Sequence, residues 1–87
     1  MPFLYILQNE KGKYYIGSTT DLTRRIKQHL SGHTYSTKRL GNLKLVFSQE
    51  YKELKDARYI ELRLKKLKRR DFIDRIVKDG FIKIKPK

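Results

Sequence analysis

Five side chains in this sequence are of the types that together can cleave a phosphodiester bond: Tyr5, Tyr15, Arg25, His29 and Glu61. An arginine can clamp a phosphate group and stabilise the negative charge that develops on it. A tyrosine hydroxyl can orient or deprotonate a water molecule when a nearby cation lowers its pKa, and a histidine transfers protons near neutral pH. A lone carboxylate suits Mg²⁺, which keeps several waters and takes oxygens from the substrate phosphate.

Each of these side chains also has a purely structural interpretation. The two tyrosines could be ordinary strand residues packed on a sheet, Arg25 could belong to a solvated basic helix face, and His29 could be a core-edge histidine bonded to a backbone carbonyl. Glu61 is more informative, because it falls inside the apolar stripe of a predicted helix, where an unpaired carboxylate is costly. It should therefore bind a cation or form a buried salt bridge with an arginine, unless the true boundary of the helix places it elsewhere.

The tyrosines lie on a predicted hairpin. Phe3–Gln8 is a near-continuous apolar run, which is typical of a central strand buried on both faces. Asn9–Gly12 has turn chemistry, and Lys13–Ser18 returns as an antiparallel strand. Because side chains alternate along a strand, Tyr14 should face the opposite side from Tyr15.

The arginine and the histidine lie on a helix that follows this hairpin. Thr20 or Asp21 is its candidate N-cap, and it should run as far as Leu30. Arg25 and His29 are four residues apart, so they share one helix face at the rim of the core. The buried stripe is predicted to be Leu22, Ile26 and Leu30.

The rest of the chain contains a third strand and two further helices. Asp71 is the candidate cap of the last helix and Gly80 its end. The apolar stripe of the long helix that carries Glu61 is Leu54, Ala57, Ile60, Leu64 and Leu67. In order, we predict a loop or short irregular helix over 33–42, a strand over Leu43–Tyr51, helices over Leu54–Arg69 and Phe72–Lys78, and an extended tail over 81–84.

The charge of the chain indicates a polyanionic partner. Twenty-two Lys and Arg against nine Asp and Glu give a net charge of +13, which nucleic acid would neutralise. The alternatives are an anionic membrane surface, for which no separate basic amphipathic segment exists, and a basic protein without such a partner. Seven residues are candidates to contact phosphates or bases: Gly17, Ser18, Thr19, Tyr35, Lys38, Arg39 and Lys65. The alternative is that they are ordinary turn, loop and helix-surface residues.

Length and composition limit the remaining possibilities. The 87 residues predict one domain over 1–87, and the absence of cysteine excludes disulfides and thiolate metal sites. No apolar run approaches the length of about 20 residues of a membrane span, and the N-terminus has no signal-peptide pattern. We therefore expect no membrane partner, a cytoplasmic location, and a monomer, because the net charge opposes close self-association.

These features together resemble the GIY-YIG nuclease family. Leu4-Tyr5 stands where the family has Ile-Tyr, with Phe3 at the position of the first motif's glycine, and Tyr15-Ile16-Gly17 matches the second half-motif outright. The spacing between the two tyrosines fits, and the similarity extends over about residues 3–80. The first helix matches through Asp21-Leu22, Arg25 and His29, and the acidic helix through Ala57, Glu61 and Lys65. The resemblance implies an α+β fold, a three-stranded antiparallel sheet flanked by helices, and hydrolysis of DNA with one divalent metal.

The resemblance also implies a role for each residue. Glu61 would hold Mg²⁺ or Mn²⁺, and Arg25 would stabilise the transition state. Tyr15 is the leading candidate to activate the attacking water, with His29 sharing the proton transfer, and Tyr5 would orient water or phosphate. Some members of the family have a late asparagine near the site that this chain lacks, so the support of the acidic ligand should differ here.

The leading hypothesis is therefore a small divalent-metal-dependent endonuclease acting on DNA. It would select structured, flapped or single-stranded DNA, or depend on a protein partner for targeting. The alternative is a non-catalytic nucleic-acid-binding module on the same scaffold, and action on RNA is a third hypothesis. Repair, mobile-element propagation, uptake processing and defence all fit the sequence.

Overall fold

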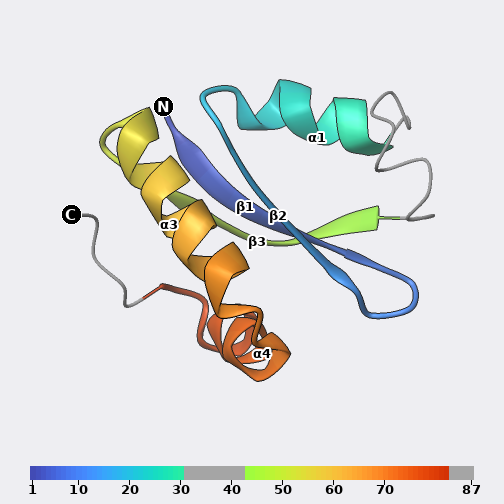
Figure 1. Cartoon of the computed structure of the whole chain (residues 1–87). Helices are drawn as coiled ribbons and strands as arrows, with labels where there is room; N and C mark the ends of the chain where they lie inside the picture. Colours follow the sequence, from blue (N-terminus) through green and yellow to red (C-terminus); the bar gives the residue numbers. More distant parts are fainter. Residues whose placement is uncertain (31–42, 83–87) are drawn as a thin grey trace.

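The computed structural model describes residues 1–30 and 43–82, and within these ranges the chain forms three strands and three helices (Figure 1). The predicted loop over 33–42 and the last residues of the predicted tail lie outside the described residues. The elements are β1 (Phe3–Asn9), β2 (Tyr14–Thr19), α1 (Leu22–Leu30), β3 (Leu43–Glu50), α3 (Leu54–Leu67) and α4 (Arg70–Asp79).

The three strands form one antiparallel sheet in the order β2-β1-β3. The predicted α+β fold with a three-stranded antiparallel sheet is confirmed, and the apolar run near the N-terminus is the central strand, as expected. In the β1–β2 register, Tyr5 pairs with Gly17 and Leu7 pairs with Tyr15. This register sets which side chains of the two strands share a face.

The turn between β1 and β2 is fixed by one asparagine and one glycine. The side-chain oxygen of Asn9 accepts the backbone N–H groups of Lys11, at 3.0 Å, and Lys13, at 2.8 Å. Gly12 has a φ of 85°, in the left-handed region that glycine adopts without strain, and donates its N–H to the Asn9 carbonyl at 2.9 Å. The turn therefore has a definite length and closes the hairpin in one register.

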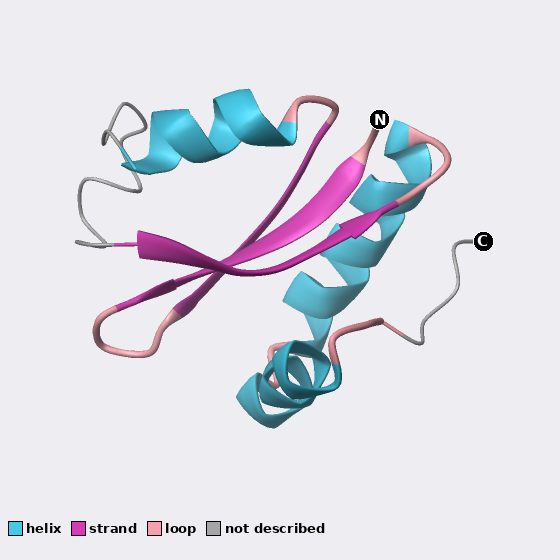
Figure 2. Ribbon diagram, turned by 180° about the vertical axis from the view of Figure 1, so that it is seen from behind, coloured by secondary structure: helices cyan, strands magenta, loops and turns pink. Residues whose placement is uncertain are grey.

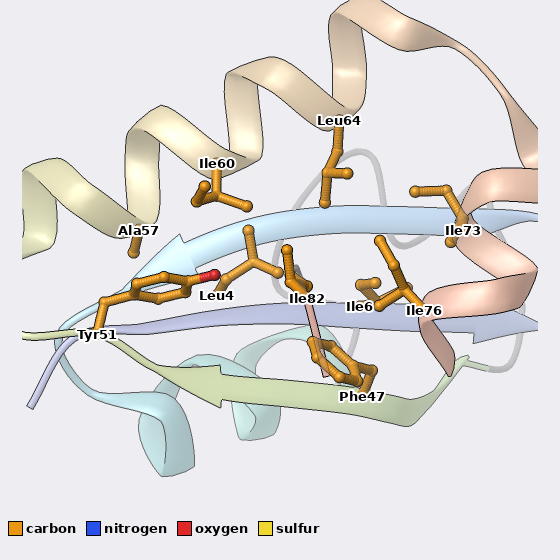
Figure 3. Packing of buried hydrophobic residues seen from close by; sticks show 10 residues of the cluster. All are labelled: Leu4, Ile6, Phe47, Tyr51, Ala57, Ile60, Leu64, Ile73, Ile76 and Ile82. Carbon is orange, nitrogen blue, oxygen red and sulfur yellow. The ribbon is translucent and has the colours of Figure 1, made fainter. Parts of the chain in front are cut away.

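Each face of the sheet carries its own core. Figure 2 shows α1 on one side of the sheet and α3 and α4 on the other. The face under α1 holds a small cluster of Tyr5, Leu7 and Leu43, with Tyr15, Leu22 and Ile26 packed against it. The other face holds the main core under α3 and α4 (Figure 3): Leu4, Ile6, Phe47, Tyr51, Ala57, Ile60, Leu64, Ile73, Ile76 and Ile82. Full burial of one aliphatic side chain contributes about 1.5–3 kcal/mol, so these contacts hold the helices on the sheet.

The end of α3 differs from the prediction. The helix stops at Leu67 rather than Arg69, and Lys68 takes a left-handed conformation with a φ of 51°. Leu67 was predicted to belong to the buried stripe, but it is 41% exposed. The reason is that the chain turns here into α4, whose Ile73 and Ile76 fill the core instead.

The helix ends confirm two predicted capping residues and correct a third. The carboxylate of Asp21 accepts the backbone N–H of Arg24 at 3.1 Å, so Asp21 caps α1. Gly80 ends α4 with a φ of 81°. Asp71 is not a cap, because α4 already begins at the residue before it. Asp71 instead lies in the first turn and pairs with Arg69 at 2.8 Å.

The short segment after α4 returns to the main core. Ile82 is buried, and its backbone N–H donates to the side-chain oxygen of Gln49 at 2.8 Å. Among the described residues, no helix is both long enough and apolar enough to cross a bilayer.

Candidate active site

A hollow of about 280 Å³ opens at the β2 edge of the sheet, where α1 and α3 approach from opposite faces. It brings together four of the five predicted catalytic side chains, contributed by β1, β2, α1 and α3. The lining residues are Tyr5, Tyr15, Ile16, Gly17, Ser18, Arg25, Arg58, Glu61 and Lys65.

The ring of Tyr5 crosses directly over Gly17, its partner on the neighbouring strand. A Cβ atom on Gly17 would collide with the phenol oxygen and the ring carbons of Tyr5. A side chain of the protein therefore lies directly against Gly17, and the glycine allows the phenol of Tyr5 to line the hollow.

His29 lies behind the two tyrosines and does not line the hollow. Its side chain is buried, and its Nε2 atom shares a hydrogen bond of 3.0 Å with the hydroxyl of Tyr5. The ring of Tyr15 packs edge-on against the imidazole, with centroids 5.2 Å apart. Among the described residues, Nδ1 of His29 has no hydrogen-bond partner. The histidine is thus a core-edge residue whose observed partner is a tyrosine rather than a backbone carbonyl.

Burial sets the charge state of this pair. It lowers the pKa of His29 below its ordinary value, and the nearby charge of Arg25 acts in the same direction. Burial raises the pKa of Tyr5 to about 12, against the opposing effect of Arg25. Both groups are therefore neutral at pH 7, and the hydrogen bond between them fixes the position of the Tyr5 hydroxyl.

The lowered pKa of His29 predicts a stability change with pH. Unfolded histidine titrates near 6.5, and the folded group titrates lower, so the unfolded state binds more protons as the pH falls below about 6.5. The wild-type protein should lose unfolding free energy between pH 7.5 and pH 5, and His29→Gln should lose less. Urea denaturation of both proteins at the two pH values checks this. Equal losses would show that His29 is not the group responsible.

Glu61 projects from α3 into the hollow and is hydrogen-bonded on both oxygens. Ser18 donates its hydroxyl to Oε1 at 2.5 Å, and Lys65 donates its ammonium to Oε2 at 2.6 Å. The Glu61 side chain is 18% exposed, whereas the Lys65 side chain is 51% exposed. The salt bridge is therefore made with a lysine one turn along the same helix rather than with an arginine. These two contacts support the acid in a chain without the late asparagine.

The remaining predicted nucleic-acid contacts divide into three groups. Gly17, Ser18 and Lys65 line the hollow. Thr19 forms a turn with its neighbour, because its hydroxyl accepts the backbone N–H of Asp21 at 3.1 Å, and it lines an adjoining hollow. The third group, Tyr35, Lys38 and Arg39, lies outside the described residues.

Arg58 lines the hollow and was not singled out from the sequence. It stands three residues before Glu61 on α3, and residues with this spacing share a helix face. That spacing was the available signal, but it was obscured by the many other basic residues of the chain. The hollow is thus lined by a second arginine, from α3, in addition to Arg25 of α1.

The donor set around the hollow fits a hard divalent cation. Glu61 is the acidic residue among the described lining residues, and the other oxygen donors are hydroxyls of Tyr5, Tyr15 and Ser18. No cluster of three or more acidic, histidine or cysteine residues occurs in the described ranges. A site with one carboxylate suits Mg²⁺ or Mn²⁺, because such ions retain waters and take phosphate oxygens from the substrate. The Lys65 side chain is 51% exposed, so its ammonium group has room to leave Glu61 if a cation binds there.

The match to known proteins agrees with this arrangement. The chain belongs to the GIY-YIG family, since residues 1–74 match the GIY-YIG catalytic domain. A UPF0213 protein of Klebsiella pneumoniae is 39% identical over 70 residues, which are 79% of this chain and 66% of that protein. The UPF0213 protein YhbQ of Escherichia coli K12 is 39% identical over 79 residues, 90% of this chain and 78% of that protein.

A solved structure supports the fold independently. The solution NMR structure of the UPF0213 protein BH0048 from Bacillus halodurans superposes with a TM-score of 0.58 and 34% identity. The superposition covers 92% of this chain and 87% of that one. The resemblance identified in the sequence is confirmed, and the family description as a catalytic domain points to a nuclease.

Proposed function

We propose that this protein is a divalent-metal-dependent endonuclease that hydrolyses phosphodiester bonds in DNA. The observation that carries the proposal is the convergence of Tyr5, Tyr15, Arg25 and Glu61 on one small polar hollow. These residues come from separate elements of the fold. A metal ligand, a phosphate clamp and hydroxyls for positioning water are the groups that hydrolysis of a phosphodiester requires.

Each side chain has a proposed role that follows from its place. Glu61 would hold Mg²⁺ or Mn²⁺, which when bound supplies Lewis-acid stabilisation of the charge on the phosphate. Arg25 clamps the phosphate and stabilises its developing charge. Tyr5 keeps its proton at neutral pH, since its pKa is raised to about 12, and orients water or phosphate by donating a hydrogen bond. Because the hydroxyl has one proton, its oxygen then accepts the Nε2–H of His29.

Tyr15, in the form of its phenolate after loss of the hydroxyl proton, is the proposed acceptor of the proton from the attacking water. His29 is separated from the hollow by the two phenols, so a direct proton transfer from substrate water to the imidazole lacks a path. We therefore assign His29 as a positioning residue that acts through Tyr5. Tyr15, rather than His29, is therefore the proposed general base.

The basic surface supplies the affinity for the substrate. With a net charge of +13, binding should weaken steeply as salt increases, because each phosphate contact releases bound counterions. Gly17, Ser18, Lys65 and Arg58 are proposed contacts at the hollow. We propose that the protein acts as a cytoplasmic monomer on structured, flapped or single-stranded DNA, or is directed by a protein partner.

One observation favours the alternative of a non-catalytic binding module. Both oxygens of Glu61 already have protein partners, Ser18 and Lys65, so a metal must compete with an ion pair. In that case the scaffold would bind nucleic acid without cutting it.

A cleavage assay distinguishes the endonuclease from the non-catalytic binding module. The protein is incubated with end-labelled single-stranded, duplex, flapped and branched DNA, and with matched RNA, in Mg²⁺, Mn²⁺ or EDTA. We expect cleavage of DNA that needs the metal. Binding without cleavage on every substrate would support the binding module, and cleavage confined to RNA would replace the proposed substrate.

A further inference from the structure

A second and larger hollow, about 700 Å³, adjoins the active site. It lies between the β1–β2 turn and the junction of α3 with α4, and we call it the basic groove. Tyr15, Ile16 and Lys65 line both hollows, so the groove is continuous with the site. Its basic lining residues are Lys11, Lys13, Lys65, Lys68, Arg69 and Arg70, and no acid is among the described residues that line it.

The groove is held in shape by contacts between α4 and the hairpin. The hydroxyl of Tyr14 on β2 donates a hydrogen bond to the carboxylate of Asp74 on α4. The guanidinium of Arg70 lies 5.8 Å from the centre of the Tyr14 ring and close to Gly12 in the turn. Figure 1 shows α4 and this turn at the same end of the molecule. The two walls are therefore set before any ligand binds.

Most of the positive charge in the groove is not neutralised by the protein. Arg69 pairs with Asp71, and Lys65 pairs with Glu61. The other four basic residues form no ion pair with any described residue: Lys11, Lys13, Lys68 and Arg70. Basic residues at the C-terminal end of α3 also interact favourably with the helix dipole, which would explain their presence without a ligand. This explanation does not apply to Lys11 and Lys13, which lie at the β1–β2 turn. A polyanion is the chemistry that these cations fit.

Among the described residues, the opposite flank of the candidate site carries less positive charge. The hollow that adjoins the site there has a volume of about 320 Å³, and its charged lining residues are Asp21, Arg24 and Arg25. Within the described ranges, the positive charge available to a bound strand is therefore greater on the side of the basic groove.

We propose that the basic groove binds the phosphodiester backbone of the substrate on one side of the scissile phosphate. The inference rests on the proposed function, which places that phosphate at Glu61 and Arg25. The enzyme would need a nucleic-acid arm on the groove side and tolerate a short arm on the other. Its substrates would then include strands cut close to one end.

Binding in EDTA tests the groove without requiring cleavage. The Kd of fluorescein-labelled single-stranded and duplex oligonucleotides is measured by anisotropy for Lys11→Gln/Lys13→Gln and for a control, Arg75→Gln/Lys78→Gln. Both variants lose two charges, but the control residues lie outside the groove. We expect the groove variant to weaken binding about tenfold and lower the salt slope by about 1.4–1.8, and the control to change Kd less than about twofold. Equal effects would overturn the proposal.

Stepwise shortening of the substrate tests the one-sided requirement. In Mg²⁺, kcat/KM should fall steeply when the arm on one side of the cut is shortened, and Lys11→Gln/Lys13→Gln should remove that difference. Single-stranded and duplex arms show which form the groove accepts. Equal dependence on both arms would overturn the inference while leaving the nuclease intact. Groove-dependent binding without any cleavage would instead overturn the proposed function and retain the groove as a nucleic-acid site.

Discussion

Glu61→Gln should lower metal-dependent cleavage by at least about 10³-fold while leaving the fold and DNA affinity nearly unchanged. Stabilisation of charge by a catalytic metal is worth several kcal/mol, and each 1.36 kcal/mol is tenfold in rate. The amide has nearly the same shape and can still accept the hydrogen bond from Ser18, but it lacks the charge that holds a hard cation. Loss of the ion pair with the exposed Lys65 costs about 1 kcal/mol or less.

Single-turnover cleavage and anisotropy measure the rate and the affinity separately. Glu53→Gln is the matched control, because Glu53 is exposed, forms an ion pair with Lys55 and lies outside the hollow. It removes the same charge and should leave the cleavage rate unchanged. Turnover by Glu61→Gln at the wild-type Mg²⁺ concentration would contradict the assignment of this residue as metal ligand.

Gly17→Ala should destabilise the protein by about 1–3 kcal/mol and sharply reduce cleavage, although it adds a single methyl group. The positive-φ glycines of the described chain are Gly12 and Gly80, so backbone strain is not the cause at Gly17. The cause is the ring of Tyr5, which occupies the position of the new Cβ atom. The ring must move, and the hydrogen bond between Tyr5 and His29 is then lost.

A double-mutant cycle isolates this clash. Tyr5→Leu removes the phenol, so adding Gly17→Ala to Tyr5→Leu should cost much less unfolding free energy than adding it to the wild type. Urea denaturation of the four proteins gives the coupling energy between the two positions. Additive effects would show that Gly17 is required for a reason other than the tyrosine above it.

The fold was largely predictable because its strongest signals are local. An apolar run identified the central strand, alternation placed Tyr14 and Tyr15 on opposite faces, and a side-chain cap marked the start of α1. The errors at Leu67 and Asp71 fall together at the α3–α4 junction. There, the packing of α4 on the sheet decides where one helix ends and the next begins, and periodicity within either helix carries no information about that packing.

The residue types of the candidate site were predictable from the sequence, but which of the side chains reach the hollow and which are buried behind it was not. Spacing on one helix correctly put Arg25 and His29 on the same face, yet it could not show that the imidazole lies behind two phenols. The partner of Gly17 follows from cross-strand register, which a single strand sequence does not specify. The spacing of three residues between Arg58 and Glu61 indicates a shared helix face, but no local sequence feature distinguishes Arg58 from the other basic residues nearby.

The short turn at Asn9–Gly12 has a consequence for how this protein can diversify. Tyr14 and Tyr15 are consecutive, and one binds α4 while the other faces the candidate active site. A slip of one residue in the hairpin would exchange them, because side-chain direction alternates along the strand. It would also move Gly17 out from under Tyr5. Surface turns usually accommodate insertions readily. Here a change in length by a single residue would turn Tyr14 towards the candidate active site and Tyr15 towards α4. Evolutionary or engineered variation is therefore better accommodated by substitutions in this turn than by indels.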